Sequence, residues 1–474
     1  MTPEQFRQYG HQLIDWIADQ RSQIYQGQPP VMAPTKPGSL KSALPRQAPE
    51  QAESMAAILA DLDHLITPAC SHFLHPRFFG YFPSNGELST VLADLVSTGL
   101  GQLGLNWQSS PALTELEEVT TDWLRQALGL SDSWQGVIHD TASVSTLVAL
   151  LCARERGNDY AMMQTGRRAD NKPLIVYTSA HAHSSVDKAA LLAGFGRQHI
   201  RHIETDEQFA LRPDKLRAQI AADRAAGFHP CAIVATVGTT STTAIDPVQA
   251  IGEIASKEKL WLHVDAALAG SAMILPECRA LWRGIEQADS LVMNPHKWLG
   301  VAFDCSVYFI RDAEHLVRVM STNPSYLQTA ADGQAKNYRD WGLQLGRRFR
   351  ALKLWFLFRE QGIEGLQIRL RRDLENTRWL AEQVRAERDW KILNPVHLQT
   401  ICLRHEPEGM NGEALDQHTL RWVNAINQSG VAYLTPSQLQ GRWMVRISIG
   451  SLPTEREHVE QLWQAMQAAV AESD

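Results

Sequence analysis

A lysine that follows an apolar segment has the clearest chemical potential in this sequence. Residues 294–300 read NPHKWLG and come directly after SLVM, so Lys297 stands at the end of an expected buried strand. Because burying an ammonium group without a partner is costly, such a lysine tends to lose its proton. A lysine that titrates easily is suited to forming a Schiff base with a carbonyl compound. Taken alone, Lys297 could equally extend its ammonium group to solvent.

Other polar side chains also stand at the ends of apolar segments. Asp265 lies near the end of WLHVDAA, where a carboxylate needs a positive or strongly donating partner. His183 follows LIVY, and His296 directly precedes the lysine. Each has an ordinary structural alternative, which is a salt bridge for the aspartate and a satisfied, partly buried ring for either histidine.

Two hydroxyl-rich turns could bind a phosphate group. DTAS (140–143) leads into an apolar helical segment, so its backbone N–H groups would stand at a helix N-terminus, which favours anions. GTTSTT (238–243) has a similar composition. A simple Ser/Thr helix cap is the plainer explanation of DTAS. This turn has no glycine, so it matches neither a Walker loop nor the dinucleotide fingerprint, which argues against a nicotinamide-dependent oxidoreductase.

Considered together, these residues predict a pyridoxal phosphate site. Lys297 would form the Schiff base, Asp265 would face the pyridinium nitrogen, the DTAS turn would hold the phosphate, and a histidine would lie against the ring. This combination accounts for every residue that the structural alternatives leave unexplained.

Short apolar segments must bring these side chains together. They alternate with amphipathic helical segments, and apolar character on both faces is typical of a parallel sheet covered by helices. Ligands bind such sheets outside the carboxyl ends of the strands. The expected strands are residues 174–177, 232–237, 261–267, 290–293 and 307–310.

The chain is too long for one hydrophobic core, since single cores stop growing at roughly 250–300 residues. We expect an N-terminal helical arm (1–85), a large α/β domain (86–360) and a small C-terminal α+β domain (361–474). Residues 321–346 fit no period, and so long an unpatterned segment is usually functional. Thr454 and Glu457 have the spacing of a capping box before a C-terminal helix.

The composition is that of an ordinary globular protein, with 44% hydrophobic and 20% charged residues. A net charge of −7 argues against nucleic acid or an anionic membrane as the main partner. No apolar segment reaches the ~18 residues of a membrane span, and the first residues lack the pattern of a secretory signal. The six cysteines show no pairing pattern, so we expect reduced, mostly buried thiols in a cytoplasmic protein without a bound metal.

Several longer segments resemble the aromatic-L-amino-acid decarboxylases. These are WLHVDAALAGSA, ADSLVMNPHKWL, YTSAHAHSSVDKAA and DWGLQLGRRFRALKLWF, and the similarity extends to HPRFFGYFPS (75–84) and essentially the whole chain. This family comprises group II pyridoxal phosphate decarboxylases with the aspartate-aminotransferase-like fold (fold type I). Bacterial members that act on L-DOPA look most similar. The resemblance implies a homodimer whose active sites lie at the subunit interface, with the N-terminal segment in the dimer contact.

The resemblance also implies a role for individual residues. Lys297 would hold pyridoxal 5'-phosphate covalently, with Asp265 at the pyridine nitrogen, His183 stacked on the ring and His296 beside the lysine. The phosphate would contact Ala142, Ser143 and Asn294, and the surroundings of the ring would include Thr240 and Ala267. Tyr338 would be the tyrosine of a mobile loop that completes the neighbouring subunit's site. In this family, tyrosine at that place accompanies decarboxylation, and phenylalanine accompanies oxidative aldehyde formation.

The predicted activity is decarboxylation of an aromatic L-amino acid (DOPA, 5-hydroxytryptophan, tryptophan, tyrosine or phenylalanine) to the amine, as in a carboxy-lyase. An aldehyde synthase, a decarboxylase of another amino acid such as histidine, and a cofactor-binding module without catalysis are the alternatives. Ser84 could meet a ring hydroxyl, although many family members carry threonine there, and Leu268 replaces a common tyrosine. Besides His183, the substrate ring could contact Tyr81, Phe82, Leu103, Leu105 and Trp107, although most of these could equally be core residues.

Overall fold

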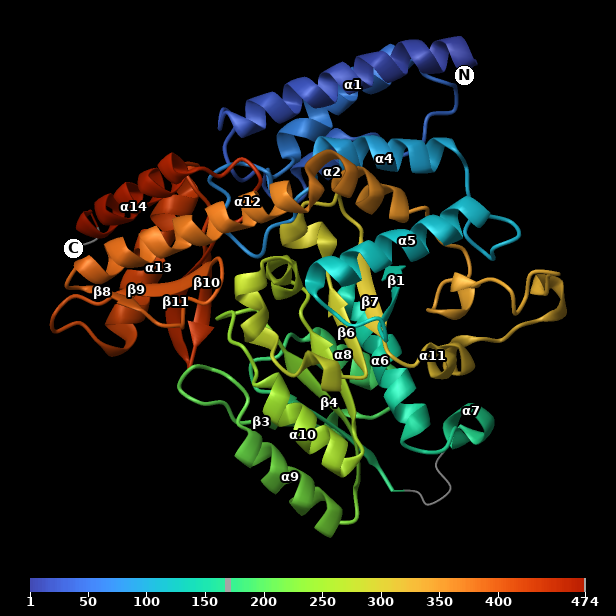
Figure 1. Cartoon of the computed structure of the whole chain (residues 1–474). Helices are drawn as coiled ribbons and strands as arrows, with labels where there is room; N and C mark the ends of the chain where they lie inside the picture. Colours follow the sequence, from blue (N-terminus) through green and yellow to red (C-terminus); the bar gives the residue numbers. More distant parts are fainter. Residues whose placement is uncertain (167–171, 473–474) are drawn as a thin grey trace. The chain divides into compact units, whose positions relative to one another are not determined.

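The computed structural model describes residues 1–166 and 172–472. The chain forms two compact units (Figure 1). The first unit combines Met1–Pro83, Trp379–Lys391 and Leu403–Asp474, and the second comprises Ser84–Arg378 and Ile392–Cys402. The predicted division into three consecutive domains at residues 85 and 360 stays a prediction. The two compact units are each assembled from separate segments of the chain.

The second unit is built on a seven-stranded sheet that is mostly parallel. Its strand order is β1-β7-β6-β5-β4-β2-β3, and β7 alone in this order runs antiparallel to its two neighbours. All five segments expected to be strands lie in it, which confirms the α/β fold class. The strands are β1 (Gln135–His139), β2 (Leu174–Ser179), β3 (Ile200–Ile203), β4 (His229–Thr236), β5 (Trp261–Asp265), β6 (Ser290–Met293) and β7 (Ser306–Ile310).

Helices cover this sheet because its strands are apolar on both faces. All residues of β2, β5, β6 and β7 are buried. Helix α6 packs against β4 to β7 and against α8, and α9 and α10 pack against β4. The helices of this unit are α4 (Leu88–Gly99), α5 (Pro111–Leu128), α6 (Ala142–Arg156), α7 (Ala161–Thr165), α8 (Ser185–Leu192), α9 (Pro213–Ala225), α10 (Val248–Glu258), α11 (Ala313–Met320) and α12 (Ala351–Ala386).

Helix α12 contains a break at Gly362, whose backbone has φ 61° and ψ 172°. This positive φ suits glycine because glycine has no Cβ to clash with the backbone. The part of α12 up to Arg378 belongs to the second unit, and the rest belongs to the first.

The first unit carries most of a smaller sheet with strand order β10-β11-β9-β8. The predicted alternating segment RWMVRIS is β11, while Thr454 does not cap the last helix: its hydroxyl donates to the carbonyl of Pro76 at 2.7 Å. The capping box is instead formed by Glu455 and His458. The elements are α1 (Pro3–Tyr25), α2 (Ser39–Ala43), α3 (Met55–Asp61), β8 (Trp390–Ile392), β9 (Thr400–His405), α13 (Gly412–Ser429), β10 (Thr435–Leu439), β11 (Arg442–Ser448) and α14 (Arg456–Ala471).

Across the residues with a described structure, no helix combines the length and apolar character that crossing a bilayer requires. Five of the six cysteines are buried and Cys70 is exposed, and all six are free thiols. The expectation of mostly buried cysteines is thus confirmed.

Candidate active site

The residues with predicted chemistry gather at the carboxyl edge of the large sheet. Asp265 is the last residue of β5, Asn294 directly follows β6, and His183 lies in the turn after β2. Because parallel strands end at the same edge, residues distant in sequence come together there.

Lys297 lies on a short turn of π-helix, η7 (Pro295–Leu299), and is half-buried. Its φ of −92° and ψ of −107° depart from helical values, so the backbone bends at the lysine itself. The N–H of Lys297 donates to the carbonyl of Asn294 at 3.0 Å, and the N–H of Asn294 donates to the carbonyl of Ala267 at 3.0 Å. These bonds tie the lysine turn to the end of β5.

The carboxylate of Asp265 is buried and held in place by its own turn. Its Oδ1 accepts the N–H of Ala267 at 3.0 Å, and Asp265 is 5% exposed. Burial lowers the pKa of His183, with a raising influence from Asp265 and a lowering influence from Lys297. Asp265 and Lys297 therefore both lie within electrostatic reach of His183.

The tautomer of His183 follows from its hydrogen bonds. Its Nδ1 accepts the backbone N–H of Ser185 at 3.2 Å and lies 2.8 Å from the hydroxyl of the same residue. In the neutral ring the proton is consequently on Nε2. The side chain lies at the surface of the unit, as expected for a ring that contacts a ligand.

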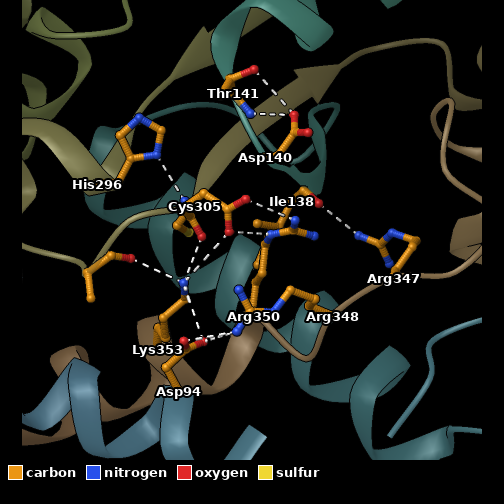
Figure 2. Close-up of polar contacts among 12 residues, drawn as sticks. Asp94, Ile138, Asp140, Thr141, His296, Cys305, Arg347, Arg348, Arg350 and Lys353 are labelled. Atoms are coloured by element: carbon orange, nitrogen blue, oxygen red, sulfur yellow. Dashed lines mark hydrogen bonds and ion pairs between the residues drawn. The ribbon is translucent and has the colours of Figure 1, made fainter. Parts of the chain in front are cut away.

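The DTAS turn is not a simple capped helix start. Thr141, at the N-cap of α6, makes no side-chain cap, and its hydroxyl instead donates to Asp140 at 3.3 Å (Figure 2). The first-turn N–H groups of Ala142 and Ser143 thus remain suited to an anion. Asn294 Oδ1 is buried without a hydrogen-bond partner among the residues described, so one end of this carboxamide is unsatisfied. The first-turn N–H groups fit a phosphate group, and the carboxamide of Asn294 can turn its NH₂ toward one, because Oδ1 makes no bond that holds it in place.

His296 is buried beside the lysine in a fixed protonation state. Its Nδ1 accepts the N–H of Cys305 at 2.9 Å, which places the proton of the neutral ring on Nε2 (Figure 2). Burial, reinforced by the charge of Lys297, lowers the pKa of His296 to about 3. The ring is neutral at physiological pH.

Three further residues that the sequence placed near the cofactor are Thr240, Ala267 and Leu268. Thr240 is half-buried in the turn after β4, and Ala267 is 9% exposed after β5. Leu268, where many family members carry tyrosine, is 1% exposed and packs in the core.

The predicted substrate residues are divided between the two units. Tyr81, in the first unit, is 49% exposed, and its hydroxyl accepts that of Tyr433 at 3.2 Å. Phe82, also in the first unit, has the guanidinium of Arg446 4.2 Å from its ring centroid.

The remaining substrate candidates, Ser84, Leu103, Leu105 and Trp107, belong to the second unit. Leu103 is 56% exposed and faces solvent within that unit. The indole N–H of Trp107 donates to Glu115 at 2.7 Å. Ser84 and Leu105 are half-buried.

Tyr338 lies in the core of the second unit and not on an exposed loop. It is 3% exposed, and its hydroxyl donates to the carbonyl of Gly136 at 3.3 Å. Its ring packs against Trp341 at 5.3 Å between centroids, and burial raises its pKa well above the usual value. The same segment contains Tyr326, which is 77% exposed. Local sequence offers no signal that distinguishes the two tyrosines.

A mostly parallel sheet with a lysine, an aspartate, a histidine and an anion-binding helix start at its carboxyl edge defines the class of protein. It is a fold type I enzyme that uses pyridoxal 5'-phosphate.

Known proteins place the chain within this class. The family described as "Pyridoxal-dependent decarboxylase conserved domain" matches residues 37–406. The chain is 39% identical to a tryptophan decarboxylase of Camptotheca acuminata, over 98% of this chain and 94% of that protein. It is 37% identical to a phenylacetaldehyde synthase of Arabidopsis thaliana, over 98% and 96% respectively. The crystal structure of Oryza sativa TDC with PLP and tryptamine matches with a TM-score of 0.95 at 33% identity, covering 100% of this chain and 99% of that one.

The chain therefore belongs to the pyridoxal-dependent decarboxylase family. It is a carboxy-lyase. Since these relatives are plant enzymes, the similarity to bacterial members stays a prediction.

Proposed function

We propose that this protein decarboxylates an aromatic L-amino acid to the corresponding amine and carbon dioxide. The observation that carries the proposal is the placement of Asp265 at the end of β5, of His183 after β2 and of the Lys297 turn after β6, at one edge of the sheet. Asp265 and Lys297 both act on the ring of His183 there. The aromatic substrate is supported by relatives named tryptophan and tyrosine decarboxylases. A further solved relative, tryptophan decarboxylase of Catharanthus roseus, was crystallised in complex with L-tryptophan.

The residues at the sheet edge have complementary roles in holding the cofactor. Lys297 Nζ would join its aldehyde carbon, and Ala142, Ser143 and Asn294 would hold its phosphate. When bound, pyridoxal phosphate supplies an electron sink for the pair left at Cα as carbon dioxide departs. Asp265 would hold a proton at the pyridine nitrogen, because a nearby carboxylate raises that nitrogen's pKa.

The two histidines would act as neutral groups. His183, with Nδ1 engaged by Ser185, would stack on the ring and present its Nε2 proton to the substrate side. His296 would stay neutral beside Lys297, so that it adds no positive charge there. Reaction specificity would come from holding the amino acid with its carboxylate perpendicular to the ring plane, which is an orientation effect.

We infer that Tyr326, and not Tyr338, is the loop tyrosine that acts in catalysis. Tyr338 would have to leave the core and break its bond to Gly136 before its hydroxyl could reach a substrate. Tyr326 is exposed within η8 (Ser325–Leu327), so it can extend to a neighbouring subunit without such a loss. Its hydroxyl would deliver the proton to Cα after carbon dioxide leaves.

We further propose that the enzyme is a cytoplasmic homodimer with active sites at the subunit interface. Within the first unit, no residue of the 23-residue helix α1 is buried. Within the second unit, α4 and the residues after it expose an apolar row of large side chains. A contiguous group of exposed, large apolar side chains marks an interaction site. The row consists of Leu88, Leu92, Leu95, Val96, Leu100 and Leu103, each 41–56% exposed.

Aldehyde synthesis is the second candidate function, because a phenylacetaldehyde synthase is among the relatives at 37% identity. The two activities differ in products. A decarboxylase releases amine and carbon dioxide. An aldehyde synthase consumes dioxygen and water and releases the aldehyde, ammonia and hydrogen peroxide in amounts equal to carbon dioxide.

The test is to incubate the purified, cofactor-loaded enzyme with each of the five aromatic amino acids and with histidine. Carbon dioxide, amine, ammonia and peroxide are measured separately. We expect amine equal to carbon dioxide for at least one aromatic substrate, and a pyridoxyl-modified peptide containing Lys297 after borohydride reduction. Peroxide equal to carbon dioxide would establish the synthase instead, and an unmodified Lys297 would refute the proposed site.

A further inference from the structure

A second lysine is buried in the same unit, and the proposed chemistry does not use it. Lys353, near the start of α12, is fully buried at 0% exposure. Burying an ammonium group is costly unless partners surround it, so the charge is retained only with compensating contacts.

Lys353 is surrounded by oxygen atoms (Figure 2). Its Nζ donates to the carbonyl of Asp304 at 2.7 Å and to that of Ala302 at 3.1 Å. The carboxylates of Asp94 and Asp304 lie 3.7 and 3.9 Å from it. The ammonium group thus fixes the backbone between Ala302 and Asp304.

Two arginines fix the carboxylates around this ammonium group. Arg350 binds both oxygens of Asp304, at 2.9 and 3.1 Å. Arg348 donates to both oxygens of Asp94, at 2.9 Å each. The two nitrogens of Arg350 restrain Asp304 more than a single bond would, so the carboxylate beside Lys353 is well positioned.

The segment held by Lys353 continues directly to the active site. Cys305 follows Asp304, and its N–H donates to Nδ1 of His296 at 2.9 Å. In return, the N–H of His296 donates to the carbonyl of Cys305 at 3.2 Å. The position of Cys305 therefore determines both the ring orientation and the tautomer of the residue next to Lys297.

Helix α12 also holds the other side of the lysine turn. Arg369, which is 8% exposed, donates to the carbonyls of Trp298 and Leu299 at 2.9 and 2.7 Å. The indole N–H of Trp298 donates to the buried carboxylate of Asp373 at 2.8 Å. Helix α12 thus anchors the turn directly after Lys297, and it reaches His296 only through residues 302–305.

We propose that Lys353 is a positioning residue for the active site. By holding the carbonyls of Ala302 and Asp304, it keeps the N–H of Cys305 on Nδ1 of His296, so that the neutral His296 carries its proton on Nε2 beside Lys297. This inference rests on the proposed function, because His296 matters only if Lys297 binds the cofactor.

Loss of Lys353 would change His296 in two ways. The charged groups that act on this ring are Lys297, Asp304 and Lys353, and Phe303 packs on it at 4.9 Å between centroids. Removing the Lys353 charge removes one cation that opposes protonation of His296. Freeing residues 302–305 also weakens the bond that occupies Nδ1. The first effect raises the pKa of His296, and the second leaves the ring free to change its tautomer.

The experiment compares the cofactor-loaded parent enzyme with Lys353→Met. The variant should bind a full complement of cofactor and keep KM within about twofold. We expect kcat to fall on the order of tenfold to a hundredfold, because small displacements of a catalytic constellation have costs of this size. The acid limb of the kcat profile should move to higher pH, as a raised histidine pKa requires. The absorbance of the bound cofactor should titrate with the same shift.

Two variants distinguish positioning from general damage. Arg371→Met removes a cation of the same helix whose partner is the exposed Glu277, at 2.7 and 3.1 Å, and it should leave kcat and both pH profiles unchanged. Lys353→Gln keeps two N–H donors for the carbonyls and removes the charge. Lys353→Gln should show the pH shift with a smaller loss of kcat. It replaces Lys353→Met in the experiment if that variant fails to fold.

An unshifted pH profile in the folded Lys353 variants, or a loss of kcat that only follows lost cofactor, would overturn the proposal. Failure of the proposed function is distinguishable, because it would appear in the parent enzyme as absent carbon dioxide release. The pH titration of bound-cofactor absorbance can be read even in that case.

Discussion

At the scale of single residues, backbone N–H groups determine which nitrogen of each site histidine is protonated. His183 is fixed by Ser185 and His296 by Cys305, both through Nδ1. These bonds lie in segments that adjoin strands of the sheet, so the protein sets the tautomers before any ligand binds. Preorganisation of this kind avoids a cost of reorientation during the reaction.

The two tyrosines of the 321–346 segment give a prediction at the same scale. Tyr326→Phe should retain cofactor binding and substrate consumption but divert product from amine to aldehyde. The proton donor for Cα is lost, so dioxygen can oxidise that carbon and is itself reduced to hydrogen peroxide. Amine, aldehyde and peroxide are measured together. Tyr338→Phe is the matched control: it should leave the product ratio unchanged and lower stability by about 1 kcal/mol through the lost hydrogen bond to Gly136. A product change in Tyr338→Phe alone would reverse the assignment.

At the scale of elements, close packing between the sheet and short helices sets the position of Asn294. Gly270 lies in η4 (Ala269–Ile274), where an added Cβ would come 2.5 Å from Cβ of Met293, the last residue of β6. Such an approach forces the two elements apart. Asn294 follows Met293 directly, so its carboxamide would move with the strand end.

We therefore predict that Gly270→Ala destabilises the protein by about 1–3 kcal/mol and weakens cofactor binding. Urea unfolding and the dissociation constant of the cofactor measure the two effects. Gly365→Ala is the control, because its Cβ would meet neighbours only at 3.6 Å, and alanine is favoured in a helix by about 0.5–1 kcal/mol. Equal behaviour of the two variants would contradict this account.

At the scale of the whole molecule, the apolar row on α4 predicts self-association. Leu95→Glu places a charge on this surface, so burial in a dimer would become costly and the dimer should dissociate. Sedimentation velocity measures the change. Leu192→Glu is the control, since Leu192 is 65% exposed on α8, away from this row in the sequence, and should leave the mass unchanged. A monomeric parent enzyme would remove the proposed interface.

Buried titratable groups predict how stability depends on pH. Burial lowers the pKa of His139 and His263 to about 4 and that of His296 to about 3. Between about pH 6.5 and 4 the unfolded chain thus binds more protons at these rings, which destabilises the fold as pH falls. Asp246, whose pKa burial raises to about 7, acts in the opposite direction.

Burial lowers the pKa of His75 to about 4 as well, so four histidine protons stand against the one of Asp246. Acidification therefore causes a net loss of stability, at about 1 kcal/mol per pH unit for each uncompensated proton. The urea midpoint should therefore be lower at pH 5 than at pH 7. His263→Gln should make this dependence shallower by about one proton. A midpoint that rises on acidification would contradict the assignment of these groups.

Much of the fold and the cofactor site was predictable from local sequence. Strands that are apolar on both faces can be recognised from their composition. Lys297 and Asp265 stand at the ends of such strands, where burying a charged side chain is costly unless it has a partner. The parallel sheet then brings their positions together by a general rule of topology.

Other features depended on contacts that no local pattern encodes. Whether Tyr326 or Tyr338 is exposed follows from packing against β1 and Trp341, and Thr454 bonds Pro76 across hundreds of residues instead of capping its helix. The sequence around Lys353 is that of an ordinary helix. Its proposed role follows only from the oxygen atoms of Asp94 and of residues 302–304, which surround its ammonium group. The sequence by itself determined which side chains could do chemistry, because that is a property of each residue and its neighbours. The tertiary structure decided which were buried, paired or exposed, because burial is a property of the surroundings that folding assembles.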